Sequence, residues 1–215
     1  MKRFKLYAMA WRKWVFKLTL TLVVAQLVLI LISWLLAAAM PDLAVKSLIS
    51  AGGIRWFFAN FSAKIATPAL VWLVLVAVAV SSVVKSGLYH ASLIFVSPQR
   101  GTLTSQQLFA LRMSVAFLVV EAIAIILLTA LPHAVLLSVT GELFPSSFSL
   151  GLVPLTAFVC TTVSVVYGLL SGTLRTLYDV GECLSSSGGW LMPLLVLYVF
   201  LAQFVVCCCY VFMFD

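Results

Sequence analysis

One acidic side chain lies inside an otherwise apolar stretch of the sequence: Glu121, in residues 113–131. An ionised acid at the centre of a membrane-crossing helix costs roughly 3 kcal/mol on insertion scales, so this carboxyl group must be protonated, hydrogen-bonded or in contact with water. Its functional interpretation is a proton or coupling-ion site, with Gln26 or Gln203 from other apolar stretches as candidate hydrogen-bond partners. The structural alternative is a protonated glutamate that holds helices together.

No second constellation of reactive side chains accompanies Glu121. His90 and His133 have no Cys, Asp or Glu at metal-ligand spacing, and the sequence contains neither a Gly-x-Ser-x-Gly element nor a phosphate-binding glycine loop. Three of the five cysteines are consecutive, Cys207 to Cys209, and would point in three directions from a helix. The sequence therefore predicts no catalytic residue, no metal site and no cofactor, and the protein is not expected to be an enzyme.

The elements that must position Glu121 are membrane-crossing helices. Hydrophobic residues make up 64% of the 215 residues and charged residues only 9%, and the mean hydropathy is +1.22. Because a helix needs about 20 apolar residues to cross the hydrocarbon core, five segments qualify. These are residues 18–40, 68–84, 113–131, 148–171 and 189–214. We expect an all-α polytopic bundle of about five transmembrane helices plus interfacial helices, forming one integral membrane domain over residues 1–215.

The net charge of +7 indicates topology and not a nucleic-acid partner. Six of the thirteen Lys and Arg residues lie within residues 1–17, directly before the first apolar segment. Such a cluster keeps the N-terminus in the cytoplasm. The first apolar segment is longer than that of a signal peptide, so we expect an uncleaved anchor in the bacterial inner membrane.

Two connecting segments and one glycine pair have predicted structural roles. Residues 42–67 mix aromatic and cationic side chains, which predicts an interfacial helix, broken near Gly52 and Gly53, that lies flat on the membrane or enters it as a partial hairpin. Residues 88–96 are expected to form a short interfacial helix. Gly168 and Gly172 form a small-xxx-small pair that could permit close helix packing.

Two blocks of the sequence resemble a known family. The first block, in residues 45–95, contains Val45-Lys46-Ser47-Leu48-Ile49, Gly53-Ile54-Arg55-Trp56 and Lys85-Ser86-Gly87-Leu88. The second block, in residues 148–206, contains Leu152-Val153-Pro154, Tyr167-Gly168, Gly172, Asp179-Val180 and Ala202-Gln203-Phe204. In this order they resemble the AbgT family of p-aminobenzoyl-glutamate transporters. The resemblance implies an ion-driven, usually dimeric secondary transporter of p-aminobenzoyl-glutamate or similar small acids, which binds its substrate on two re-entrant hairpins.

The sequence departs from the family pattern where those hairpins should be. Residues 96–112 run directly into the third apolar segment, and the second hairpin should follow Phe204, close to the last residue, Asp215. The resemblance therefore implies a shortened member lacking both hairpin regions, and no family binding residue has a matching position. The matching residues have scaffold roles: Gly87 ends a helix, and Asp179 caps or orients a cytoplasmic connection.

Two functional hypotheses follow. The first is a shortened transporter of small organic acids in which Glu121 couples ion movement to transport. The second is a non-transporting membrane scaffold or subunit that associates with a full-length carrier or another membrane complex. The expected partners are the lipid bilayer, a second copy in a homo-oligomer, such as a dimer, or a larger membrane protein, and a small organic acid.

Overall fold

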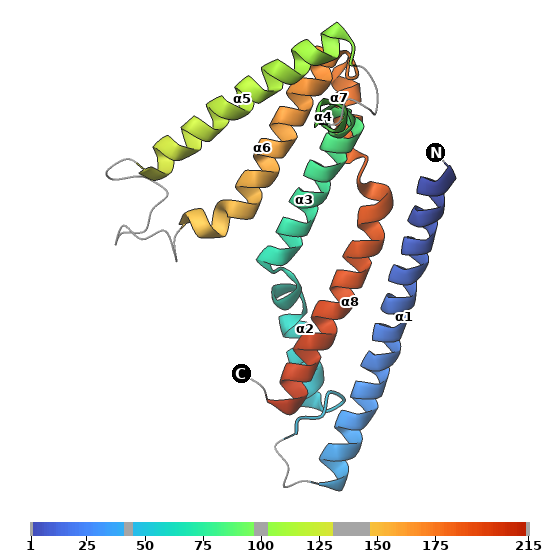
Figure 1. The fold of residues 1–215 in the computed structure, drawn as a ribbon. Helices are drawn as coiled ribbons and strands as arrows, with labels where there is room; N and C mark the ends of the chain where they lie inside the picture. Colours follow the sequence, from blue (N-terminus) through green and yellow to red (C-terminus); the bar gives the residue numbers. More distant parts are fainter. Residues whose placement is uncertain (1, 41–44, 97–102, 131–146, 214–215) are drawn as a thin grey trace. The chain divides into compact units, whose positions relative to one another are not determined.

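The computed structural model describes residues 2–40, 45–96, 103–130 and 147–213, and within these ranges the ordered elements are all helices (Figure 1). They are α1 (Lys2–Ala39), α2 (Ala51–Ile65), α3 (Pro68–Lys85), α4 (Leu88–Val96), α5 (Ser105–Ala130), α6 (Ser147–Ser171), α7 (Leu177–Ser185) and α8 (Gly188–Phe212). The expected all-α class is confirmed.

Among the described residues, five helical segments are long and apolar enough to cross a membrane, as expected. They are Trp11–Ala39, Ala51–Lys85, Ser105–Leu128, Gly151–Ser171 and Leu177–Phe212. Two of them are compound, because the second contains α2 and α3 and the fifth contains α7 and α8. The chain separates into two compact units, one of residues 1–71 and 189–215 and one of residues 72–188.

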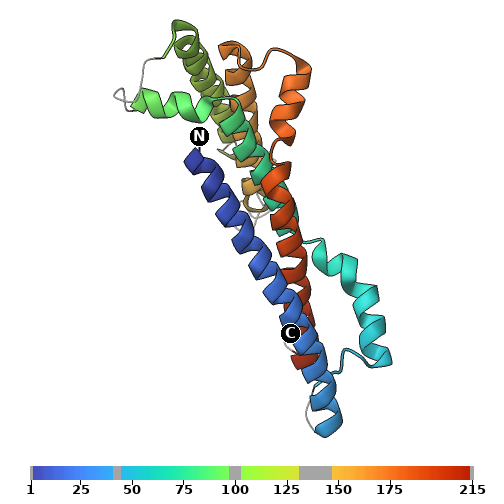
Figure 2. The same ribbon diagram turned by 90° about the vertical axis from the view of Figure 1, so that its right-hand side faces the viewer.

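In the first unit, α1 and α8 run side by side (Figure 2), and their shared core contains Leu29, Leu48, Cys207 and Val211. Two hydrogen bonds connect the segment before α2 to α8 and to α1. The backbone N–H of Lys46 donates to the carbonyl of Val211 at 3.1 Å, and that of Leu48 donates to the buried Ser33 hydroxyl at 3.3 Å.

Helix α2 lies along α8. The Trp56 ring stacks on the Tyr210 ring with centroids 3.9 Å apart, and at the other end of α2 the Tyr198 hydroxyl donates to the carbonyl of Ile65 at 3.0 Å. Because Tyr198 and Tyr210 are separated by more than three turns of α8, the contacts follow a long part of that helix. Helix α2 also belongs to the second candidate span and continues into α3, so it lies along α8 in neither of the two arrangements expected for residues 42–67, flat on the membrane or as a partial hairpin.

The expected break near Gly52 and Gly53 is wrong, because both glycines lie in the first turn of a continuous α2. The Ser50 hydroxyl caps this turn by accepting from the Gly53 N–H at 3.0 Å. Gly53 is required because a Cβ atom would lie 2.4 Å from the carbonyl oxygen of Ser47. The break occurs instead at Ala66 and Thr67, where Pro68 removes a backbone donor and disfavours helical geometry at the preceding residue.

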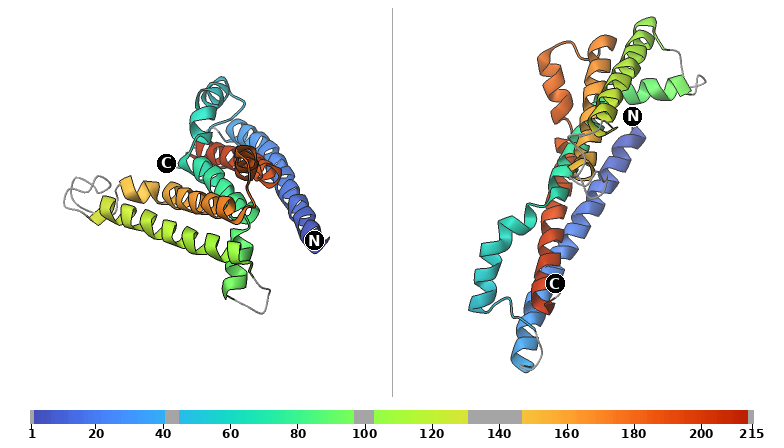
Figure 3. Two further views of the ribbon diagram at one scale, coloured as in Figure 1. Left: turned by 90° about the horizontal axis from the view of Figure 1, so that it is seen from above. Right: turned by 90° about the vertical axis from the view of Figure 1, so that its left-hand side faces the viewer.

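In the second unit, α5 and α6 pair along their length (Figure 3), and α4 packs against both. Buried side chains from these helices include Ala91, Ala110, Leu111 and Tyr167. The expected short helix over residues 88–96 is α4, and Gly87, with φ +83°, ends α3 as expected.

The two glycines proposed as a packing pair have different environments. A Cβ atom on Gly168 would lie 2.5 Å from Leu174 Cδ1 and 3.3 Å from Ser86 Cβ, so this position needs glycine for close approach. Gly172 has φ +78° and follows the last residue of α6, where a left-handed glycine commonly ends a helix.

Hydrogen bonds and one ion pair connect α3 to α7. The Ser81 hydroxyl donates to the carbonyl of Cys183 at 3.0 Å, and the Lys85 ammonium lies 3.0 Å from a Glu182 carboxylate oxygen. Asp179 accepts from the backbone N–H groups of Arg175 and Thr176, each at 2.9 Å, and so forms the expected cap at the start of α7.

Candidate functional site

Glu121 lies on α5 and contacts α6. The hydroxyl of Thr162 donates to Glu121 Oε1 at 2.7 Å. The second oxygen, Oε2, is buried and has no hydrogen-bond partner among the described residues. The carboxyl group thus has one polar neighbour and one free oxygen, a combination that is costly for a permanently ionised acid in an apolar helix pair.

The Thr162 hydroxyl has one proton to donate but three acceptors within hydrogen-bond distance. Besides Glu121, its hydroxyl oxygen lies 3.0 Å from the carbonyls of Phe158 and Val159 on its own helix. If Glu121 is ionised, Thr162 can donate to it. If Glu121 is protonated, the carboxylic acid can donate to Thr162, and Thr162 can donate back to α6. The pair can therefore accommodate both charge states without moving a helix.

Thr162 was missed by sequence reasoning. Its partner oxygen is 41 positions away along the chain, and the connection between α5 and α6, residues 131–146, lies outside the described residues. The sequence shows that Thr162 is a polar residue on the neighbouring apolar segment. Without the register of the two helices, however, Thr162 could not be distinguished from the other Ser and Thr residues of α6 as the partner of Glu121.

Gln26 and Gln203, the expected partners of Glu121, belong to the other unit. Both line a cavity of approximately 280 Å³ between α1, α2 and α8. Gln26 is buried, and its Oε1 has no hydrogen-bond partner among the described residues. The remaining lining is apolar or weakly polar: Ile30, Leu48, Ile49, Ile54, Phe57, Phe58 and Cys207.

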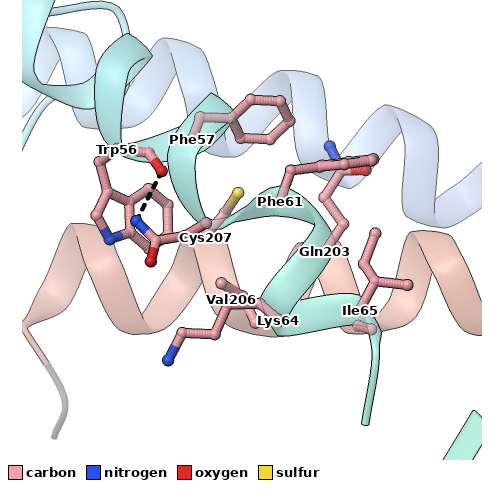
Figure 4. A pocket seen from close by; sticks show the side chains of 10 residues that line it. Trp56, Phe57, Phe61, Lys64, Ile65, Gln203, Val206 and Cys207 are labelled. Atoms are coloured by element: carbon pink, nitrogen blue, oxygen red, sulfur yellow. Dashed lines mark hydrogen bonds between the residues drawn. The ribbon is translucent and has the colours of Figure 1, made fainter.

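A smaller cavity lies on the same unit beside the break between α2 and α3. Its volume is approximately 20 Å³, enough for about one water molecule. Figure 4 shows Phe57 and Phe61 of α2 beside Cys207 and Gln203 of α8, with Lys64 next to Val206. Lys64 lines this cavity together with Val206 of α8.

The break itself has its polar groups satisfied by α8. The Tyr198 hydroxyl donates to the Ile65 carbonyl and also contacts the Thr67 hydroxyl. Helix breaks at membrane depth require such partners, because no water is available in the hydrocarbon core. Broken helices of this kind also form ion and substrate sites in secondary transporters.

The remaining reactive residue types stay dispersed in the described part of the chain. No group of three His, Cys, Asp or Glu residues there is placed to hold a metal ion. Cys207 is buried, Cys208 is partly buried and Cys209 is exposed, in agreement with three side chains pointing in three directions. His90 lies on α4, and His133 lies outside the described residues.

Comparison with known proteins provides the functional context. The model of the AbgT putative transporter family matches residues 95–211, more than half of the chain, a range that includes Glu121, Thr162 and Gln203. The second resembling block lies within this range, whereas nearly all of the first block precedes it. The fold is similar to that of the YdaH transporter from Alcanivorax borkumensis, with a TM-score of 0.73 and 16% identity over 91% of this chain and 71% of that chain. No curated protein matches the sequence.

Proposed function

Because the chain belongs to the AbgT putative transporter family, we propose that it transports p-aminobenzoyl-glutamate or a similar small organic acid across the bacterial inner membrane, coupled to protons through Glu121. Family membership supports the transporter class. The specific substrate and the coupling ion are parts of the proposal.

The observation that carries the coupling role is the environment of Glu121. Its carboxyl group is hydrogen-bonded to Thr162 on one oxygen, and its buried second oxygen has no partner among the described residues. A proton bound to this carboxylate removes a buried charge, while Thr162 retains carbonyl acceptors on α6. Protonation and release at Glu121 can therefore alternate within an unchanged helix pair, as a coupling site requires.

Uptake of labelled p-aminobenzoyl-glutamate into proteoliposomes under an imposed pH gradient tests this role. We expect Glu121→Gln to abolish gradient-driven uptake while leaving expression and oligomeric size unchanged, because glutamine keeps the shape and cannot exchange a proton. Glu182→Gln is the matched control, since Glu182 pairs with Lys85 at an exposed position. Unchanged uptake in Glu121→Gln would rule out Glu121 as the coupling residue.

The exposed apolar surface of α5 is compatible with a second candidate function. Many of its large side chains are exposed in the single chain, including Val115, Val119, Val120, Ile123 and Leu127. Lipid, a second copy or a larger membrane protein could cover this surface. Purification from native membranes in a mild detergent distinguishes these cases: a co-purifying carrier, together with no uptake by the chain alone, would favour a non-transporting subunit.

A further inference from the structure

The position of Lys64 points to a second polar site in the first unit. Lys64 lies in the last turn of α2, directly before Ile65, whose carbonyl accepts from Tyr198. Tyr198 follows the first residue of α8 by ten positions and precedes the last by fourteen, or roughly 15 and 21 Å along the helix. The backbone of Lys64 is therefore near the middle of a candidate span and not at its end.

A lysine at this depth is unfavourable unless its ammonium group reaches water or an anion. Its position at the C-terminal end of α2 provides partial compensation from the helix dipole. In the described part of the chain the recorded ion pair is that between Lys85 and Glu182, which lies in the other unit. No described carboxylate therefore neutralises Lys64.

A cavity of approximately 580 Å³ connects Lys64 with a second lysine, Lys46. The Lys46 ammonium lies 5.6 Å from the centroid of the Tyr210 ring, and Tyr210 stacks on Trp56 at 3.9 Å. Val206, Cys209 and Met213 complete the described lining, and none of these described residues carries an acidic side chain. Two ammonium groups, two aromatic rings and apolar walls thus surround one space.

We propose that this cavity between α2 and α8 binds a small organic acid, with its carboxylate held by Lys64 and Lys46 and its apolar part against Trp56, Tyr210 and Val206. The inference deepens the proposed function, because it assigns a binding site to the transported acid. The oxyanion could also come from an anionic lipid headgroup. The depth of Lys64 favours the soluble acid, because a lipid phosphate stays at the membrane surface.

Direct binding to the purified full-length chain in phosphatidylcholine nanodiscs tests the proposal without any ion gradient. The probes are p-aminobenzoyl-glutamate and its uncharged diamide. We expect the acid to bind more tightly than the diamide, and Lys64→Gln and Lys46→Gln each to weaken binding of the acid by about tenfold, with little effect on the diamide. Arg55→Gln is the matched control, since Arg55 lies on the same helix but does not line the cavity.

Two further variants keep the test decisive. Lys64→Arg retains the charge and should retain binding, so a loss caused only by misfolding of Lys64→Gln would be recognised. Glu182→Gln should bind the acid normally, and because binding is measured without uptake, a chain that binds the acid but shows no gradient-driven uptake would contradict the proposed function and not this site.

The proposal is overturned if the acid and the diamide bind equally, if neither binds, or if Lys64→Gln binds the acid as well as the unmodified chain does. Nanodiscs containing phosphatidylglycerol provide the lipid comparison. Unchanged affinity for the acid supports a soluble ligand. Loss of acid binding there, together with retention of phosphatidylglycerol by the unmodified chain but not by Lys64→Gln, would assign the cavity to a lipid headgroup and overturn the proposal.

Discussion

At the scale of single residues, Thr162 is the recorded partner of Glu121. Its hydroxyl lies within hydrogen-bond distance of Glu121 Oε1 and of two carbonyls of α6. A hydrogen bond to a charged group contributes about 1.5–3 kcal/mol, more than a bond between neutral groups. The coupling role proposed for Glu121 therefore depends on the Thr162 hydroxyl.

Replacing Thr162 with valine should reduce gradient-driven uptake. Thr162→Val keeps the side-chain shape but removes the donor, so Glu121 Oε1 loses its recorded hydrogen-bond partner. At about 1.4 kcal/mol for each tenfold change in rate, a loss of about 1.5–3 kcal/mol corresponds to a decrease of about ten- to a hundredfold. The measurement is initial uptake rate in proteoliposomes under an imposed pH gradient.

Thr161→Val is the matched control, because the Thr161 hydroxyl bonds only to the carbonyl of Ala157 among the described contacts. It should leave the uptake rate unchanged. Equal uptake rates for Thr162→Val and the unmodified chain would contradict the role given to the Thr162 hydroxyl.

At the scale of elements, the break between α2 and α3 depends on one residue of α8. Pro68 prevents a continuous helix, and the Ile65 carbonyl and the Thr67 hydroxyl both contact the Tyr198 hydroxyl. The same break places the end of α2, and with it Lys64, beside the middle of α8. Pro68 is a local feature of the sequence, but the contact with α8 determines where along that helix α2 ends.

Tyr198→Phe should destabilise the first unit. It removes the hydroxyl but leaves the ring, so the Ile65 carbonyl loses one of its two recorded donors and keeps the Thr67 N–H, at a cost of about 0.5–1.5 kcal/mol. Thermal unfolding in detergent should show a lower midpoint, and hydrogen exchange should increase at the last turn of α2. Tyr89→Phe, at an exposed position on α4, should change neither measurement. Equal midpoints for both variants would show that the break does not depend on Tyr198.

At the scale of the whole molecule, five candidate spans and an asymmetric charge distribution predict the orientation. We expect residues 1–17 in the cytoplasm, and an odd number of spans would then put the C-terminal end of α8 on the opposite side. The segment before α2 then lies on the outer side, so the cavity lined by Lys46 and Lys64 would be reached from there.

Reporter fusions test this orientation. We expect green fluorescent protein fused to the N-terminus to fluoresce and alkaline phosphatase fused after residue 215 to be active, because each reporter functions only on its expected side. An inactive phosphatase fusion that is nevertheless expressed would show that the end of α8 faces the cytoplasm. Reducing the N-terminal positive charge, by replacing Lys13 and Lys17 with glutamine, should increase the inverted fraction.

The sequence by itself determined the helical class, the five apolar spans and the ends of several helices. These properties depend on local composition and on nearby residues: apolar runs of sufficient length, Gly87 after α3, and Asp179 three residues after the Thr176 cap. The same reasoning singled out Glu121, because a carboxyl group in an apolar stretch is unfavourable wherever the helix packs.

Only the tertiary structure decided which polar groups meet. It paired Glu121 with Thr162, brought Gln26 and Gln203 to one cavity, and set Lys64 against α8. Apolar helices carry little information about their neighbours, because nearly every face is compatible with lipid or with another helix. The depth of α2 was ambiguous for the same reason, since its mixture of aromatic and cationic side chains suits the membrane surface and a lysine-lined cavity equally well.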